Sequence, residues 1–218
     1  MKRLVVASLN YSSWSVRAWL ALKYAGIEFR THEVGLFVDP EWKQKVLQFS
    51  GAGKVPILID GSLSVHEALA ICEYAAELVP AARLWPEARE LRARARAISC
   101  EMSTNFACLR NEMSMNARAR FTLKGVSEGA KWEIARVKDI WSASLQASGG
   151  PYLFGHFTIA DAMYFPILSR FRTYGVELAG DFASYQATLW ETPVVQEWWR
   201  LAQSAAAIPK YDAPSNWG

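Results

Sequence analysis

The chain has 218 residues, of which 51% are hydrophobic and 21% charged, and its formal net charge at pH 7 is +3. This composition is typical of a soluble globular protein with a sizeable core and excludes a disordered chain. The net charge is too small to indicate a nucleic-acid partner. No stretch approaches the ~20 apolar residues of a membrane span, so we expect no membrane segment.

The three cysteines, Cys72, Cys100 and Cys108, lack the Cys-x-x-Cys spacing of redox and zinc sites. Their odd number also argues against a disulfide framework. We therefore expect buried free thiols, a reducing cytoplasmic location and no bound metal.

A hydroxyl-rich turn, Asn-Tyr-Ser-Ser-Trp-Ser, follows the first predicted strand at residues 4–9 and leads into an amphipathic stretch that ends at residue 26. A strand that enters a helix in this way leaves unpaired backbone N–H groups at the positive helix end, which suits an anion or a thiolate. One of Ser12, Ser13 and Ser15 is expected to act only as the helix cap. Since no cysteine lies nearby, a thiol handled at this turn has to come from a ligand.

The remainder of the first 79 residues predicts further strands and helices. In chain order these are a strand at 28–34, a weak helix at about 40–49, a strand that opens at Val55-Pro56, its hairpin partner at 63–65, and a helix from His66 to about Leu78. Asp60-Gly61-Ser62 is the hairpin turn, and Glu67 falls in the first turn of the last helix, where an acid suits the dipole. The order strand, helix, strand, helix, strand, strand, helix is complete by Val79.

Pro80 and Pro86 bracket a short linker, and everything beyond it predicts helices. We expect one long helix or two abutting helices at 87–116, then helices at 127–147, 158–172, 182–191 and 193–206, and an irregular tail at 208–218. The expected division is therefore a first domain at 1–79, a linker at 80–88 and a helical domain at 89–218.

Asp161 is a tempting catalytic acid, but Thr158-Ile159-Ala160-Asp161 has the spacing of a capping box, which accounts for both polar residues at once. A Ser-His-Asp hydrolase can be drawn from Ser13, His66 and Asp161. The chain has no Gly-x-Ser-x-Gly elbow, so we weigh this reading far below the others.

Together, four motifs resemble the glutathione S-transferase family, and the likeness runs the whole chain. They are the turn Tyr11-Ser12-Ser13-Trp14-Ser15-Val16-Arg17, the strand entry Gly53-Lys54-Val55-Pro56, the helix start Glu67-Ala68, and Thr158-x-x-Asp161. The turn and residues 101–118 look most like bacterial serine-type members. The resemblance implies an α/β plus all-α fold: an N-terminal thioredoxin-like domain (βαβαββα) followed by an all-helical domain, assembled as a homodimer.

The same resemblance implies glutathione as the co-substrate, a small hydrophobic electrophile in a cleft between the domains, and activation of the glutathione thiol. It assigns the thiol contact to Ser13, with Ser12 close behind, the cysteinyl backbone to Val55 beside a cis Pro56, the glycyl carboxylate to Lys54, and the γ-glutamyl end to Glu67 and the N–H of Ala68.

One position departs from the family pattern, which commonly has Ser after that glutamate, whereas this chain has Ala68. The backbone N–H of residue 68 is kept and the serine hydroxyl is lost, so the sequence does not determine how tightly glutathione would bind. A non-catalytic binding or scaffold protein of the same fold is the main alternative. Conjugation, peroxide reduction, reductive dehalogenation and double-bond isomerisation would all use the same glutathione site.

Overall fold

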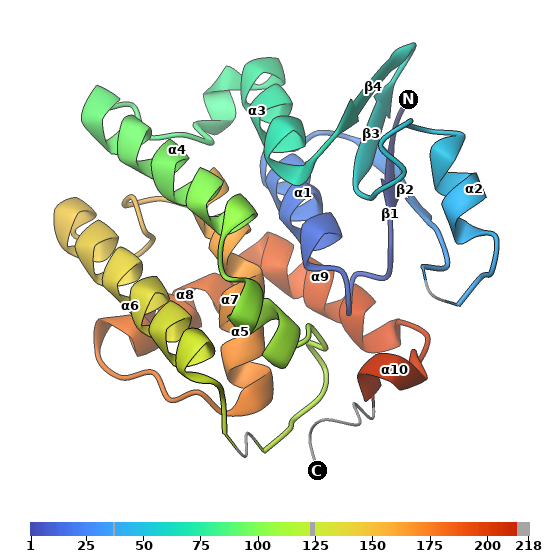
Figure 1. Cartoon of the computed structure of the whole chain (residues 1–218). Helices are drawn as coiled ribbons and strands as arrows, with labels where there is room; N and C mark the ends of the chain where they lie inside the picture. Colours follow the sequence, from blue (N-terminus) through green and yellow to red (C-terminus); the bar gives the residue numbers. More distant parts are fainter. Residues whose placement is uncertain (37, 123–124, 213–218) are drawn as a thin grey trace.

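A computed structural model describes residues 1–36, 38–122 and 125–212 (Figure 1). The first part of the chain forms a four-stranded sheet with three helices: β1 (Lys2–Val6), α1 (Ser13–Tyr24), β2 (Phe29–Glu33), α2 (Trp42–Leu47), β3 (Ile57–Asp60), β4 (Leu63–His66) and α3 (Ala68–Leu78). The strand order is β2-β1-β3-β4, with β1 and β2 parallel and the other neighbours antiparallel. The expected βαβαββα order is confirmed.

Strand β1 lies inside the sheet and is buried on both faces. Because successive side chains of a strand alternate, Leu4 and Val6 join the large core that contains α1 and α3, while Val5 packs in a smaller cluster with Val46 of α2. These three side chains, Leu4, Val5 and Val6, are fully buried. The sheet is thus covered by α1 and α3 on one face and by α2 on the other (Figure 1).

The second part of the described chain is helical. It comprises the 3-10 turn η1 (Pro80–Ala82), α4 (Arg89–Thr104), α5 (Ala107–Glu112), α6 (Glu128–Ser148), α7 (Ile159–Tyr174), α8 (Asp181–Glu191), α9 (Pro193–Ser204) and α10 (Pro209–Asp212). Helix α7 is buried along its length except at Arg172. We propose that the chain divides into domains 1–79 and 89–218, joined by a linker at 80–88.

Three expectations need correction. Glu67 lies outside the first turn of its helix: it is the residue before α3, with a φ of 70°, and α3 begins at Ala68. The tail is not wholly irregular, because Pro209–Asp212 form α10; residues 213–218 lie outside the described residues. All three cysteines are free, but Cys100 is exposed, since it lies on the solvent face of α4.

The turn that leads into α1 is held by both parts of the chain. The Nε of Arg17 donates to the carbonyl of Met163 on α7 at 2.8 Å, and the indole N–H of Trp198 on α9 donates to the carbonyl of Leu9 at 2.9 Å. These buried bonds tie the N-terminal end of α1 to the helical domain.

Candidate functional site

The polar turn at residues 8–15 is built by its own hydrogen bonds. The carbonyl of Ser8 accepts from the backbone N–H groups of Tyr11 and Ser12 at 3.1 and 2.8 Å. Ser12 is the N-cap of α1: its Oγ accepts from the N–H of Ser15 at 3.3 Å and shares a 2.9 Å hydrogen bond with the Ser15 hydroxyl. The expectation that one serine caps the helix is confirmed, and that serine is Ser12.

Ser13 is placed differently from Ser12. It is the first residue of α1, its side chain is 6% exposed, and its Oγ accepts a hydrogen bond from Nη2 of Arg170 at 3.4 Å. Within the described residues, the backbone N–H groups of Ser13 and Trp14 have no hydrogen-bond partner. These open donors face outward from the positive end of a twelve-residue helix, which favours a negatively charged group there.

A polar cavity of about 290 Å³ brings together residues that are far apart in the sequence. It is lined by Trp14, Lys54, Val55, Pro56, His66, Glu67 and Ser103. The peptide bond between Val55 and Pro56 is cis, as the family resemblance implies. In the part of the chain that the structure describes, no ion pair joins the Lys54 ammonium or the Glu67 carboxylate to another residue. The cavity therefore presents one free cation and one free anion.

Backbone groups complete this polar cavity. Neither the N–H nor the C=O of Val55 is hydrogen-bonded among the described residues, so both are open to an extended peptide. Glu67 has a φ of 70° and a ψ of 127°, a backbone conformation that costs a residue other than glycine roughly 1 to 3 kcal/mol. Strain of this kind is concentrated at ligand sites. Ala68 begins α3 behind Glu67 and is 1% exposed, so its methyl group packs in the core.

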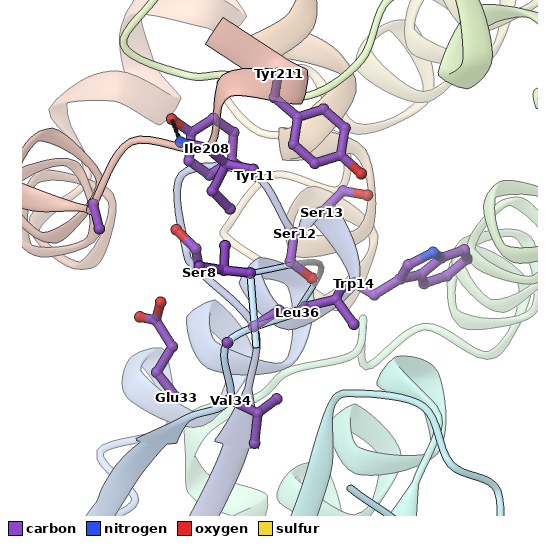
Figure 2. Close-up of a pocket in the computed structure, with 14 residues that line it drawn as sticks. Ser8, Tyr11, Ser12, Ser13, Trp14, Glu33, Val34, Leu36, Ile208 and Tyr211 are labelled. Carbon is purple, nitrogen blue, oxygen red and sulfur yellow. Dashed lines mark hydrogen bonds between the residues drawn. The ribbon is translucent and has the colours of Figure 1, made fainter. Parts of the chain in front are cut away.

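A second cavity, of about 360 Å³, adjoins the first and is mostly apolar (Figure 2). Its lining comes from β1, the serine turn, the segment after β2 and the C-terminal segment: Ala7, Ser8, Tyr11, Ser12, Ser13, Trp14, Glu33, Val34, Gly35, Leu36, Val38, Ala206, Ile208 and Tyr211. Trp14 lines both cavities. Figure 2 shows Trp14 at one end of the apolar cavity and Glu33 at the other.

Polar groups in the apolar cavity are few. The Ser8 hydroxyl is buried and has no hydrogen-bond partner. Burial raises the pKa of the Glu33 carboxyl above its usual value, which favours its protonated form relative to an exposed glutamate. An apolar molecule with one polar end would fill this cavity well.

Tyr11 lies beside the serines, but its hydroxyl proton is already donated in a hydrogen bond within the protein. The hydroxyl donates to Oδ1 of Asp212 at 2.6 Å and accepts from Nη2 of Arg118 at 2.8 Å. Burial, followed by the hydrogen bond to Asp212, raises the pKa of Tyr11. Tyr11 therefore anchors the C-terminal segment and is not free to donate to a ligand.

The sequence motifs and the cavities agree in part. Lys54, Val55, Pro56 and Glu67 line the polar cavity, and Ser12 and Ser13 line the apolar one, whereas Ala68 lines neither. Sequence reasoning missed two classes of residue. Trp14 was part of the motif but had no role, and Ser103 and Tyr211 carry no local signal because only the packing of α4 and α10 brings them to the cavities.

Asp161 lies away from both cavities, inside the helical domain. Its carboxylate accepts from the N–H and the hydroxyl of Thr158 at 2.8 and 2.9 Å, which confirms the capping box. It also accepts from the N–H of Leu153 and the hydroxyl of Tyr185, each at 3.1 Å. No hydrogen bond joins it to Ser13 or His66 among the described residues, so the structure gives no support to a Ser-His-Asp triad.

Two family models match this chain. "Glutathione S-transferase, N-terminal domain" matches residues 11–78, and "Glutathione S-transferase, C-terminal domain" matches residues 133–200. The chain belongs to the glutathione S-transferase family. The sheet followed by a helical domain is the fold of this family, and Trp14, which lies in the first matched range, lines both cavities.

The relatives of this chain are named for two different activities. A probable maleylacetoacetate isomerase from Caenorhabditis elegans is 29% identical over 77% of each chain. Glutathione S-transferase 1 from Dianthus caryophyllus is 28% identical over 79% of this chain and 78% of its own. A glutathione transferase homolog from Burkholderia, solved with bound glutathione, superimposes with a TM-score of 0.69 at 24% identity and covers 94% of this chain and 99% of its own.

The described residues offer neither a membrane span nor a metal site. In residues 1–36, 38–122 and 125–212, no helix is long and apolar enough to cross a membrane. Across those same residues, no group of three or more histidine, cysteine, aspartate or glutamate side chains is placed to hold a metal ion.

Proposed function

We propose that this protein is a glutathione transferase that ionises the thiol of glutathione for attack on a small hydrophobic electrophile. The observation that carries the proposal is the pair of adjoining cavities at the N-terminal end of α1. One holds an unpaired cation and an unpaired anion, the other is apolar, and the open N–H groups of Ser13 and Trp14 lie at the helix end near them.

The polar cavity suits the zwitterionic peptide. Lys54 would pair with the glycyl carboxylate, and the open N–H and C=O of Val55 would hold the cysteinyl backbone as an added strand does. Glu67 would take the γ-glutamyl ammonium, and the N–H of Ala68 at the start of α3 would take its carboxylate. The Burkholderia homolog of the same fold, solved with bound glutathione, supports this assignment.

The thiol has to be ionised near neutral pH. A free cysteine thiol has a pKa of about 8.5, and each unit by which that pKa falls represents about 1.4 kcal/mol of thiolate stabilisation. We assign the contact with the sulfur to Ser13, with Ser12 as the second candidate. The Ser12 oxygen is engaged with two groups of Ser15 as the helix cap, whereas Ser13 has no capping bond.

Turnover tests the proposal directly. The protein should catalyse the substitution of a generic aryl halide by glutathione, and calorimetric titration should show glutathione binding. Binding without turnover across aryl halides, peroxides and conjugated enones would favour a non-catalytic member of the fold. Absence of glutathione binding would contradict the proposal itself.

The two serines are separated by single substitutions. Ser13→Ala should raise the pKa of bound glutathione and lower kcat with little change in glutathione affinity, because the hydroxyl acts on the sulfur and not on the peptide ends. Ser12→Ala should instead destabilise the protein by about 1 kcal/mol through loss of the helix cap. The reverse pattern would transfer the thiol contact to Ser12.

Isomerisation of a conjugated cis double bond is a second candidate, because the Caenorhabditis elegans relative is named as a probable maleylacetoacetate isomerase. The same thiolate would add to one carbon of the double bond, permit rotation about the resulting single bond and leave again. Glutathione is then regenerated and not consumed. Conversion of a maleyl compound to its fumaryl isomer at constant glutathione concentration would identify this reaction.

We also propose that the protein acts in the cytoplasm, whichever of the two reactions it catalyses.

A further inference from the structure

Three guanidinium groups gather behind the start of α1. They belong to Arg17 on α1, Arg110 on α5 and Arg170 on α7, and we call them the arginine cluster. Arg17 is fully buried and Arg170 is 5% exposed, while Arg110 is half-buried. Arg17 lies 4.5 Å and Arg110 lies 5.4 Å from the centre of the Trp14 ring, so both guanidinium groups contact the residue that lines both cavities.

The arginine cluster has an excess of positive charge. Both terminal nitrogens of Arg17 and one of Arg110 are buried and have no hydrogen-bond partner among the residues that the structure describes. In the described part of the chain, neither Arg17 nor Arg170 forms an ion pair. Burial, together with the neighbouring guanidinium groups, lowers the pKa of Arg17 well below its usual value and that of Arg170 to about 10.

The groups that face the arginine cluster do not neutralise it. From α3 comes the Cys72 thiol, whose pKa burial raises to about 12, and from α7 come the phenols of Tyr164 and Tyr174, whose pKa values burial also raises. Glu133 on α6 is the acid that acts on Arg110 and offsets part of its charge, and its oxygens also accept from the N–H groups of Cys108 and Leu109.

Uncompensated buried cations are costly, and their presence beside a cavity indicates that an anion is stabilised nearby. That anion does not bind the buried nitrogens themselves, since they have almost no exposed surface. The positive charge has to act on that anion through an intermediate group, and Ser13 is placed to be that group.

The Arg170 side chain is held rigidly against Ser13. Its Nε donates to the carbonyl of Met113 at 2.7 Å, its Nη1 donates to the carbonyl of Pro166 at 3.3 Å, and its Nη2 donates to Ser13 Oγ at 3.4 Å. A hydroxyl that accepts from a cation keeps its own proton free and becomes a stronger donor. The Ser13 side chain lies in the lining of the apolar cavity (Figure 2).

We propose that Arg170 is a positioning residue for thiol ionisation: it orients the Ser13 hydroxyl toward the glutathione sulfur, while Arg17 and Arg110 supply further positive potential. The inference rests on the proposed function. In the ionisation step the S–H bond breaks, the proton passes to water, and the electron pair stays on sulfur. Ser13 keeps its own proton and donates it as a hydrogen bond to the thiolate.

The test compares Arg170→Gln with Arg172→Gln, a control on the same helix whose guanidinium stacks on Trp190 and Trp199 and not on Ser13. The thiolate absorbance of protein-bound glutathione is followed against pH. Arg170→Gln should raise the pKa of the bound thiol by about one unit, which is a tenfold smaller ionisation constant, and the control should not move it. The rate with an aryl halide should recover at high pH, because the thiolate then forms without help.

A double-mutant cycle with Ser13→Ala separates the route through the hydroxyl from a general effect of charge. If Arg170 acts through Ser13, the shift caused by Arg170→Gln should become much smaller when Ser13 is already alanine. Arg110→Gln removes a half-buried charge that touches none of these hydrogen bonds, and it should raise the pKa of the bound thiol by a smaller amount. It keeps the inference testable if Arg170→Gln fails to fold.

The outcomes are distinct. An unchanged pKa of bound glutathione in folded Arg170→Gln, or in Arg110→Gln where the former does not fold, would overturn this inference and leave the proposed function standing. An undiminished shift in the Ser13→Ala background would overturn the route through the hydroxyl. Failure of the wild-type protein to bind glutathione would overturn the proposed function, and this inference with it.

Discussion

Neighbouring residues of one turn have separate tasks because their side chains leave the backbone in different directions. Ser12 closes the N-terminal end of α1, Ser15 accepts from the N–H of Ala7 at 3.1 Å, and Ser13 contacts Arg170. Tyr11 is bonded to Asp212. Ser12 and Ser15 share a hydrogen bond between their hydroxyls, so Ser13 is the serine of this turn whose hydroxyl lies outside that pair.

The residue at position 68 determines how the γ-glutamyl carboxylate would be held. Ala68→Ser would add a hydroxyl at the start of α3, and a hydrogen bond to a charged group contributes about 1.5 to 3 kcal/mol, so glutathione affinity should rise tenfold or more. The value of kcat should change little, since this end of the peptide is bound alike in ground and transition states.

Calorimetric titration of the wild type and Ala68→Ser checks that expectation. Ala68 packs in the core, so a thermal melt of both forms should accompany the titration. Equal affinities in two equally stable proteins would show that another donor already serves the carboxylate.

Helix α7 is the central element of the helical domain, and its first turn is fixed by one buried carboxylate. Burial raises the pKa of Asp161 to about 6, and the four hydrogen bonds that it accepts oppose this rise. Because that pKa is higher than the value of about 3.9 in an unfolded chain, the stabilisation linked to this group is complete below about pH 4 and is lost as pH rises through about 6.

Asp161→Ala should lower the free energy of unfolding by about 3 kcal/mol, because it leaves buried donors of Thr158, Leu153 and Tyr185 without an acceptor. The difference from the wild type should shrink as pH rises from 4 to 7. Activity per folded molecule should stay near normal.

Denaturant unfolding at several pH values measures this effect. Asp139→Ala, a change at an exposed acid on α6, is the matched control and should cost less than about 0.5 kcal/mol. A folded Asp161→Ala protein without turnover would give Asp161 a catalytic role.

At the scale of the whole molecule, residues about 200 positions apart close the apolar cavity. Helix α10 lies beside the turn before α1 (Figure 1), where Asp212 accepts from Tyr11 at 2.6 Å and from Asn116 at 2.9 Å. The Tyr11 and Tyr211 rings stack at 5.5 Å. The C-terminal segment thus forms one wall of the proposed electrophile site.

Asp212→Ala should loosen this wall, since it removes the carboxylate that accepts from Tyr11, Asn116 and the N–H of Ile208. We expect the KM for the electrophile to rise several-fold while glutathione affinity, measured by calorimetry, is unchanged. Steady-state kinetics with Asp139→Ala as the control check this result. A rise in the glutathione Kd of equal size would show that α10 supports both cavities.

The family resemblance also predicts a homodimer in which the first domain of one subunit pairs with the second domain of the other. Each domain carries exposed apolar side chains, Leu63 and Leu78 on the first and Trp132 on the second. Sedimentation should give twice the 24.4 kDa mass of the chain at micromolar concentration. A monomer at that concentration would contradict the prediction.

Local patterns determined the elements of this protein. The apolar run that begins at Leu4, the hairpin turn at residues 60–62 and the capping box before α7 predict local backbone conformations, and the structure has a strand, a hairpin and a capped helix at these places. The division between α4 and α5 was left open, because Phe106 takes a φ of 64° that no propensity indicates. The order of these elements agrees with the fold class that the family resemblance implied.

Only the tertiary structure decided which side chains meet. Ser13 and Arg170 are 157 positions apart, Arg17 and Met163 are 146 apart, and no local signal links either pair. The sequence by itself indicated a serine turn and a peptide-binding strand. Packing of α7 against α1, and the contact of Arg110 on α5 with Trp14, placed a cationic cluster behind that turn, because burial, and not sequence spacing, determines where a charge lacks a partner.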